Sequence, residues 1–194
     1  MTRGIFVTAA ALPAAALAVI GLFHPVELEP ATATRWWQLH VLLLPIFPLL
    51  GAALCLLLRG ESGPLAWTAR VAAYVYAVYY TGLDTLAGIA AGRIVEVEGE
   101  RGQAALAVMA LGNELAEVGV YAFAVAVVLT AVVRVRRDGR PALAGAGLLV
   151  VATVPFLHGH IYWPAGGLAM VGIAAGCALL AATADLIHRS VRPD

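Results

Sequence analysis

Long apolar runs, separated by short polar or Gly/Pro-rich segments, dominate the hydrophobic pattern of the chain. A run of about 20 residues spans roughly 30 Å as a helix, which matches the hydrocarbon core of a bilayer. The pattern therefore predicts an all-α integral membrane protein, a six-transmembrane-helix bundle in which residues 1–194 form one domain. The expected helices cover about residues 4–23, 37–58, 69–91, 104–133, 142–157 and 165–187.

Composition and charge agree with a protein that lives in lipid. The chain is 62% hydrophobic and 12% charged, whereas soluble domains carry about 25% charged residues. It has no lysine, its net charge is +0 and it lacks a basic patch, so a nucleic-acid partner is not expected. Nine arginines fall on one side of the predicted bundle and three on the other. The positive-inside rule then predicts a multi-pass cell-membrane protein with both termini in the cytoplasm.

Small residues and prolines predict how the helices pack. Pro45 and Pro48 should kink the second helix and free backbone carbonyls for other partners. The pairs Gly88/Gly92 and Gly172/Gly176 have the small-xxx-small spacing of close helix contacts. These contacts could lie within the bundle, or could join a second copy or a partner subunit.

Acidic residues interrupt the third and fourth apolar runs. Asp84 lies in the third run, and Asn113, Glu114 and Glu117 share one broad helix face in the fourth. A charged group at the centre of a membrane helix costs about 2.5–3.5 kcal/mol, so such residues usually mark function. No Arg or Lys lies deep in any predicted run. The acids are therefore expected to need a proton, a histidine, a metal or a cationic ligand, and the three carboxylates are the candidate catalytic groups.

Four of the five histidines fall on the predicted outer side. His158 and His160 cannot share a helix face, since residues i and i+2 are about 200° apart. In an extended turn, however, a His-x-His segment can chelate a metal. We predict a metal site formed by His40, His158, His160 and Glu117, with His24 in the surrounding shell. Mixed imidazole and carboxylate ligands suit a divalent transition metal such as Zn, Cu or Fe.

Aromatic and amide side chains surround the expected outer mouth of the site. Trp36, Tyr80, Asn113 and Tyr162 are the candidate substrate-binding residues for a small-molecule or ion ligand. Tryptophan and tyrosine at this level also serve as anchors at the membrane surface. Whether the histidines and the acids form one site or two is left open by their spacing.

Three functions compete on this pattern. The first is a metal site open to the outer face, used for catalysis, uptake or sensing. The second is a transporter or substrate-binding subunit for a cationic or proton-coupled solute, in which Asp84, Glu114 and Glu117 bind the cargo. The third is a b-type haem protein, with the haem between His40 and His158 or His160. This arrangement is disfavoured because haem-ligating histidines usually lie deeper in facing helices.

Overall fold

A computed structural model describes residues 2–190 of the chain, with side chains described up to residue 183. Within these residues the chain is helical throughout, apart from short connections. The elements are α1 (Arg3–Gly21), α2 (Ala33–Leu43), α3 (Phe47–Leu57), α4 (Pro64–Leu83), the π-helix η1 (Asp84–Ala90), α5 (Ala91–Glu98), α6 (Gln103–Asp138), the short 3₁₀ helix η2 (Arg140–Ala142), α7 (Leu143–Gly159) and α8 (Ala165–Ser190).

Five helical segments in the described part of the chain are long and apolar enough to cross a membrane. They are Arg3–Gly21, Ala33–Leu57, Gln103–Asp138, Arg140–Gly159 and Ala165–Thr183. The third expected span, which begins with α4, is not among them. Arg70 and four tyrosines lower the hydropathy of α4, although this helix packs along α6. The membrane-type bundle is thus supported, while the count of six spans and the cytoplasmic termini stay predictions.

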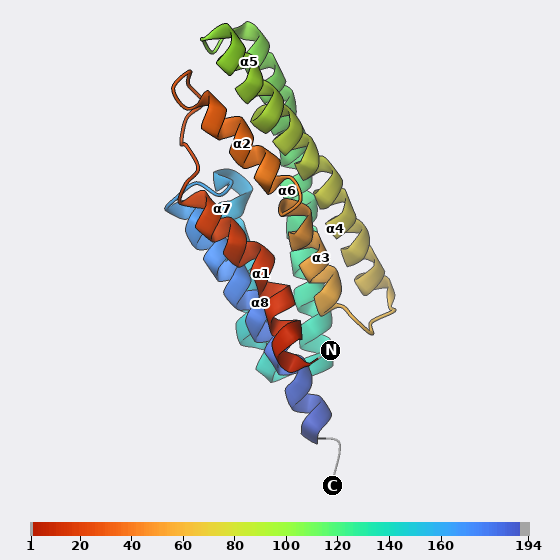
Figure 1. The fold of residues 1–194 in the computed structure, drawn as a ribbon. Helices are drawn as coiled ribbons and strands as arrows, with labels where there is room; N and C mark the ends of the chain where they lie inside the picture. The colour runs from red at the N-terminus through yellow and green to blue at the C-terminus, as the bar shows by residue number, and fades with distance from the viewer. Residues whose placement is uncertain (1, 191–194) are drawn as a thin grey trace.

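The helices form two groups, one of which extends further than the other at one end of the molecule (Figure 1). In the first, α4, η1 and α5 make one continuous rod that lies along α6. In the second, α1 and α7 pack against α8, and α3 lies between the groups, in contact with α1 and α4. Because α6 has 36 residues, it is about 54 Å long, well over a hydrocarbon core. The rod and α6 therefore project beyond α1 and α7 at one end.

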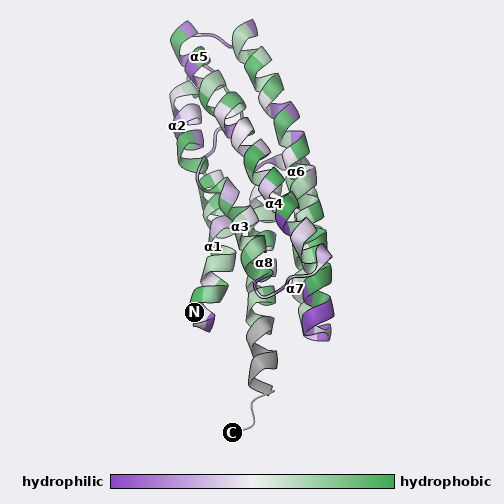
Figure 2. Cartoon of the chain, turned by 90° about the vertical axis from the view of Figure 1, so that its right-hand side faces the viewer, coloured by the Kyte–Doolittle hydropathy of each residue, from purple (hydrophilic) through white to green (hydrophobic). Residues whose placement is uncertain are grey.

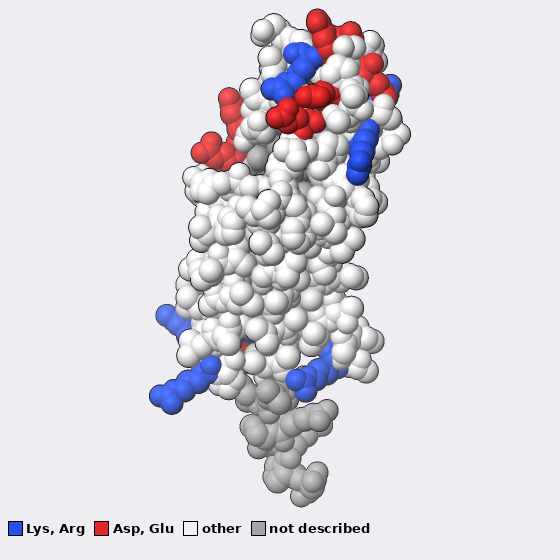
Figure 3. Space-filling model, turned by 90° about the vertical axis from the view of Figure 1, so that its left-hand side faces the viewer, with Lys and Arg blue, Asp and Glu red and all other residues white. Residues whose placement is uncertain are grey.

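Charge is divided between the two ends of the molecule, with an apolar band between them (Figures 2 and 3). The acidic end carries Glu27, Glu29, Glu96, Glu98 and Glu100. The arginine-rich end carries Arg3, Arg59, Arg70, Arg136, Arg137 and Arg140. The side chain of Arg189 and all of Arg192, which enter the orientation argument, lie outside the described residues. The asymmetry of the described arginines agrees with the one on which the predicted orientation rests.

Prolines act on the helices in different ways. The second helix breaks between Leu43 and Phe47, around Pro45 and Pro48, which confirms the expected kink. In contrast, α7 continues through Pro155 to Gly159, slightly past its expected end at about residue 157. The fourth helix also continues past its expected end at residue 133, as far as Asp138.

Both glycine pairs make contacts within the chain. A Cβ on Gly88 would lie 2.2 Å from ring atoms of His40, and a Cβ on Gly92 would lie 2.9 Å from Cβ of Trp37. Both glycines therefore let α2 approach the rod closely. Gly172 and Gly176 likewise contact Ala152 and Leu149 of α7. Association with another copy through these glycines stays a prediction.

Buried aromatic rings fill the middle of the bundle. We call Phe47, Tyr76, Tyr80, Phe123 and Phe156 the aromatic layer, because all five are almost completely buried. Their contacting ring centroids lie 4.6 to 6.5 Å apart. The layer lies on the arginine-rich side of the site described next.

Candidate metal centre

Three histidines from distant parts of the sequence meet near the acidic end. His24 follows α1, His40 lies in α2 and His160 caps α7. One ring nitrogen from each lies within 4.8 Å of those of the other two. The ring centroids are 4.9 Å apart for His24 and His40, 5.5 Å for His24 and His160, and 6.1 Å for His40 and His160. We refer to these three residues as the histidine cluster.

Each histidine of the cluster already uses its Nδ1 atom. The Nδ1 of His24 lies 2.7 Å from the carbonyl oxygen of Pro25, and that of His40 lies 2.8 Å from the carbonyl oxygen of Trp36. A carbonyl can only accept, so both rings donate from Nδ1 and keep a lone pair on Nε2. The Nδ1 of His160 lies 2.7 Å from the hydroxyl of Tyr80. Metal-binding histidines are oriented by hydrogen bonds of this kind on their second nitrogen.

Two of the remaining ring nitrogens have no hydrogen-bond partner among the described residues. Nε2 of His24 and Nε2 of His160 are buried and make no hydrogen bond. An unsatisfied buried polar group costs about 1–3 kcal/mol. Burial also lowers the pKa of His24, which favours the neutral imidazole that binds metals. A cation between the rings would give the free nitrogens a partner.

The spacing of the rings fits a single metal ion. Imidazole nitrogens bind zinc at about 2.0–2.1 Å, and tetrahedral angles then place neighbouring ring centres about 5 Å apart. The measured separations of 4.9, 5.5 and 6.1 Å lie near that value.

The π-helix explains how His40 reaches the cluster. Within η1, Gly88 has no side chain, so the ring of His40 can lie against the backbone. The neighbouring Ala87 carbonyl accepts a hydrogen bond of 3.0 Å from Nε1 of Trp36. Single-turn π-helices often occur at functional sites, because they alter the helical hydrogen-bond pattern locally. Here η1 fixes both the helix that carries His40 and the indole beside it.

A second set of contacts brings His160 beside His24. Trp163 donates from Nε1 to the carbonyl oxygen of Ala18, 2.9 Å away, in the last turn of α1. Close by, Gly21 leaves room for the carbonyl oxygen of Ile161. The loop after α7 is therefore fixed to the end of α1, from which His24 follows directly.

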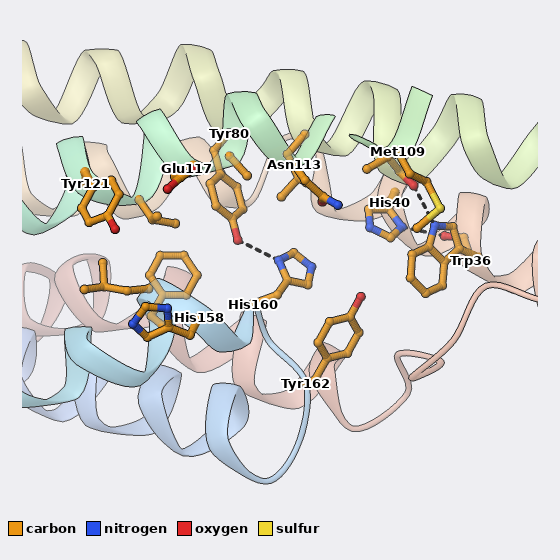
Figure 4. Close-up of a pocket in the computed structure, with 16 residues that line it drawn as sticks. Trp36, His40, Tyr80, Met109, Asn113, Glu117, Tyr121, His158, His160 and Tyr162 are labelled. Atoms are coloured by element: carbon orange, nitrogen blue, oxygen red, sulfur yellow. Dashed lines mark hydrogen bonds between the residues drawn. The ribbon is translucent and has the colours of Figure 1, made fainter. Parts of the chain in front are cut away.

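A cavity of about 560 Å³ adjoins the cluster. His40 and His160 form part of its wall, together with all four predicted substrate-binding residues, Trp36, Tyr80, Asn113 and Tyr162. Figure 4 shows these side chains around the cavity, between α6 on one side and α7 on the other. His40 and Tyr80 are buried, whereas Asn113, Glu117, Tyr121 and His158 are exposed, so the exposed four mark its mouth.

The histidines that lie together are not all those expected as metal ligands. His158 lies inside α7 rather than in an extended turn, and it is exposed at the mouth of the cavity, outside the histidine cluster. His24, expected only in the surrounding shell, lies in the cluster with His40 and His160. Glu117 lines the same cavity as His40 and His160 but does not belong to the group of close ligand atoms. His40, His160 and this one carboxylate thus line the same cavity, whereas His24 does not line it.

The three predicted catalytic acids lie in different surroundings. Asp84 is completely buried, and neither of its oxygens has a hydrogen-bond partner. Glu117 lines the cavity, while Glu114 is exposed and does not line it. Glu117 is 19 residues from Arg136 on α6, a rise of about 28 Å. Glu114 and Glu117 therefore lie near the edge of a 30 Å apolar core rather than deep within it.

These observations define a membrane-type helical bundle with a three-histidine cluster and an adjoining cavity near one edge of its apolar band. A scan against protein-family models, a search of curated proteins and a search of solved structures each return no match to the chain.

Proposed function

We propose that this protein is a metal-dependent membrane enzyme that binds a divalent transition metal through His24, His40 and His160. The observation that carries the proposal is the state of the ring nitrogens. Every Nδ1 has a partner, whereas the buried Nε2 atoms of His24 and His160 have none. Under the predicted orientation, the site faces the outer side of the membrane.

The number of ligands favours catalysis over a purely structural metal. Structural zinc sites are closed by four protein ligands, whereas catalytic sites hold three and keep a position for water or substrate. His40 and His160 lie on the cavity wall, so the open position would face the cavity. A metal there would lower the pKa of a bound water to about 7 and make it a nucleophile. Glu117 of the same cavity is the candidate general base.

Transport through the bundle is the less favoured function. A transported ion or solute needs a path from the cluster to the opposite end. The aromatic layer fills the bundle on that side, with Phe47 only 5.2 Å from His160 between ring centroids. A haem is also disfavoured, because the ring of His24 lies 4.9 and 5.5 Å from those of His40 and His160 and leaves no room for a macrocycle between them.

Metal content and cobalt spectroscopy test this proposal. The purified protein in detergent is first analysed for bound metals, then stripped with a chelator and reloaded with Zn²⁺ or Co²⁺. Wild type should take up one ion per chain. Each of His24→Gln, His40→Gln and His160→Gln should lose this ion, whereas His158→Gln should retain it as a matched control at the end of α7. Equal loss from all four variants, or no uptake by wild type, would overturn the assignment.

The open position is tested on the same cobalt protein. Its visible spectrum reports coordination, so a small anion such as azide should change it by entering the exchangeable position. A spectrum that azide leaves unchanged would indicate a closed, structural site. Accumulation of Zn²⁺ inside proteoliposomes, dependent on the histidine cluster, would show transport instead.

A further inference from the structure

The cavity beside the histidine cluster is lined by both polar and apolar side chains. His160, Tyr162, Asn113 and Glu117 contribute polar groups, while the apolar lining includes Val120, Phe156 and Leu157. Its volume is about 560 Å³, whereas one water occupies about 30 Å³ of the liquid. The cavity is thus far larger than a metal ion and its water require, and its lining suits a molecule with a polar and an apolar part.

The mouth of the cavity opens toward the membrane rather than along the bundle axis. Asn113, Glu117 and Tyr121 follow one another at four-residue spacing on α6, and His158 lies across from them on α7. All four are exposed. Tyr121 is 15 residues from Arg136, about 22 Å along the helix, and Glu117 is about 28 Å away. The mouth therefore extends from within a 30 Å hydrocarbon core to its edge.

We infer that the cavity binds an amphipathic phosphoester lipid, which enters sideways between α6 and α7 from the leaflet at the acidic end. The head group lies by the histidine cluster, where a phosphate oxygen coordinates the metal. Asn113 and Glu117 accept hydrogen bonds from hydroxyl or amine groups of the head. The acyl chain leaves past Val120, Phe156 and Leu157. The metal contact rests on the proposed function, but the binding of the chain does not.

The dependence of binding on chain length tests this inference. The probes are inorganic phosphate and butyl, hexyl and octyl phosphate, titrated into the cobalt-loaded protein below their micelle-forming concentrations. The change in the cobalt spectrum gives Kd. Each methylene that leaves water contributes about 0.8 kcal/mol, so Kd should fall about fourfold per methylene at most. Transfer from detergent rather than water reduces this factor, so the variants below provide the comparison.

Two alanines of α6 provide a matched pair of variants. Ala116 lines the cavity, whereas Ala110 is exposed on the same helix and does not line it. Ala116→Phe should fill the path of the chain and abolish the gain with chain length, while the response to inorganic phosphate remains. Ala110→Phe should behave as wild type. Metal content should be the same in both variants, which shows that each is folded.

The possible results separate the two proposals. Equal Kd values for inorganic and octyl phosphate, on a protein that binds cobalt, would overturn the lipid inference and leave the metal site intact. An unchanged gain with chain length in Ala116→Phe would also overturn it. If no metal binds, the proposed function fails. The chain contact is then tested alone by native mass spectrometry of octyl phosphate adducts, which Ala116→Phe, but not Ala110→Phe, should lose.

Discussion

Buried polar groups occur at both ends of the apolar band, and the two sets differ in how they are satisfied. At the arginine-rich end, Arg134 is completely buried and pairs with Asp138 at 2.6 Å. Its guanidinium also donates to the carbonyl oxygens of Leu57, at 3.0 Å, and of Leu180. Only its Nε lacks a partner. Arg134 thereby joins the ends of α3 and α6 to α8, and its role is structural.

In the histidine cluster, His24 and His40 are buried and His160 is half-buried, and each ring is satisfied on one side only. Its Nδ1 atoms have partners, while the buried Nε2 atoms of His24 and His160 have none among the described residues. Burial alone therefore does not distinguish a structural polar group from a binding site. What distinguishes them is whether the group is complete within the described chain. Arg134 nearly is, whereas the cluster is not.

The largest stability effect should come from breaking the arginine pair. Arg134→Met leaves Asp138 buried with one remaining partner, Arg137, and should cost about 3–5 kcal/mol of unfolding free energy. The double variant Arg134→Met, Asp138→Leu removes the stranded charge and should recover most of the loss. Reversible unfolding in detergent measures both. A single variant that unfolds like wild type would show that the pair contributes little to the fold.

The histidine cluster should respond in the opposite way, with a loss of metal affinity. A Cβ on Gly88 would lie 2.2 Å from ring atoms of His40, so Gly88→Ala must displace that ring. We expect Zn²⁺ affinity to fall by more than the roughly 10–100-fold that loss of an outer-shell partner causes. Gly147→Ala is the matched control, since nothing lies within 4 Å of a Cβ there. Competition with a fluorescent chelator measures the affinity.

A smaller loss of metal affinity is expected when a hydrogen-bond partner of the cluster is removed rather than one of its histidines displaced. Tyr80→Phe removes the hydroxyl that lies 2.7 Å from Nδ1 of His160 and should lower Zn²⁺ affinity about 10–100-fold. Tyr76→Phe, one turn earlier on the same helix, removes a buried hydroxyl that has no partner. It should leave metal affinity unchanged and be neutral or stabilising. Equal effects of the two variants would show that the hydroxyl of Tyr80 does not orient His160.

Features that depend on local periodicity could be predicted from the sequence. The apolar runs gave helices close to those observed, and Pro45 and Pro48 gave the break between α2 and α3. The end of the fourth helix could not be found in this way. The expected helix ended at residue 133, just before Arg134, but α6 continues to Asp138, because the carbonyls of Leu57 and Leu180 accept hydrogen bonds from this guanidinium.

The types of residue at the site could be predicted from the sequence, but not which histidines lie together. Histidines gathered on one side of the predicted bundle, and Trp36, Tyr80, Asn113 and Tyr162 do line the cavity next to them. The sequence favoured His158 over His24, because a His-x-His spacing is visible locally. The choice of His24 depends on the contact between Trp163 and the end of α1. A contact between residues 145 positions apart leaves no local sequence pattern.

The smallest expected effect is the pH dependence of the stability of the metal-free protein. It should come from the end of the apolar band that carries the histidine cluster. Burial lowers the pKa of His24, and the charge of Arg35 lowers it further, against the hydrogen bond to Pro25. His40, His160 and Tyr162 face the same ring. Below the unfolded pKa of about 6.5, the unfolded chain binds more protons than the folded one. Stability should therefore be complete above that pH and should decrease as the pH falls.

Thermal unfolding of the stripped protein between pH 8 and pH 5 measures this dependence. Tm should be flat at the alkaline side and fall below about pH 6.5. Saturating Zn²⁺ should move the fall to lower pH, because the metal binds the neutral rings and competes with protons. His24→Gln should reduce the slope, whereas His158→Gln, whose ring is exposed, should keep it. The same slope in both variants would place the titrating group elsewhere and separate the pH dependence from the cluster.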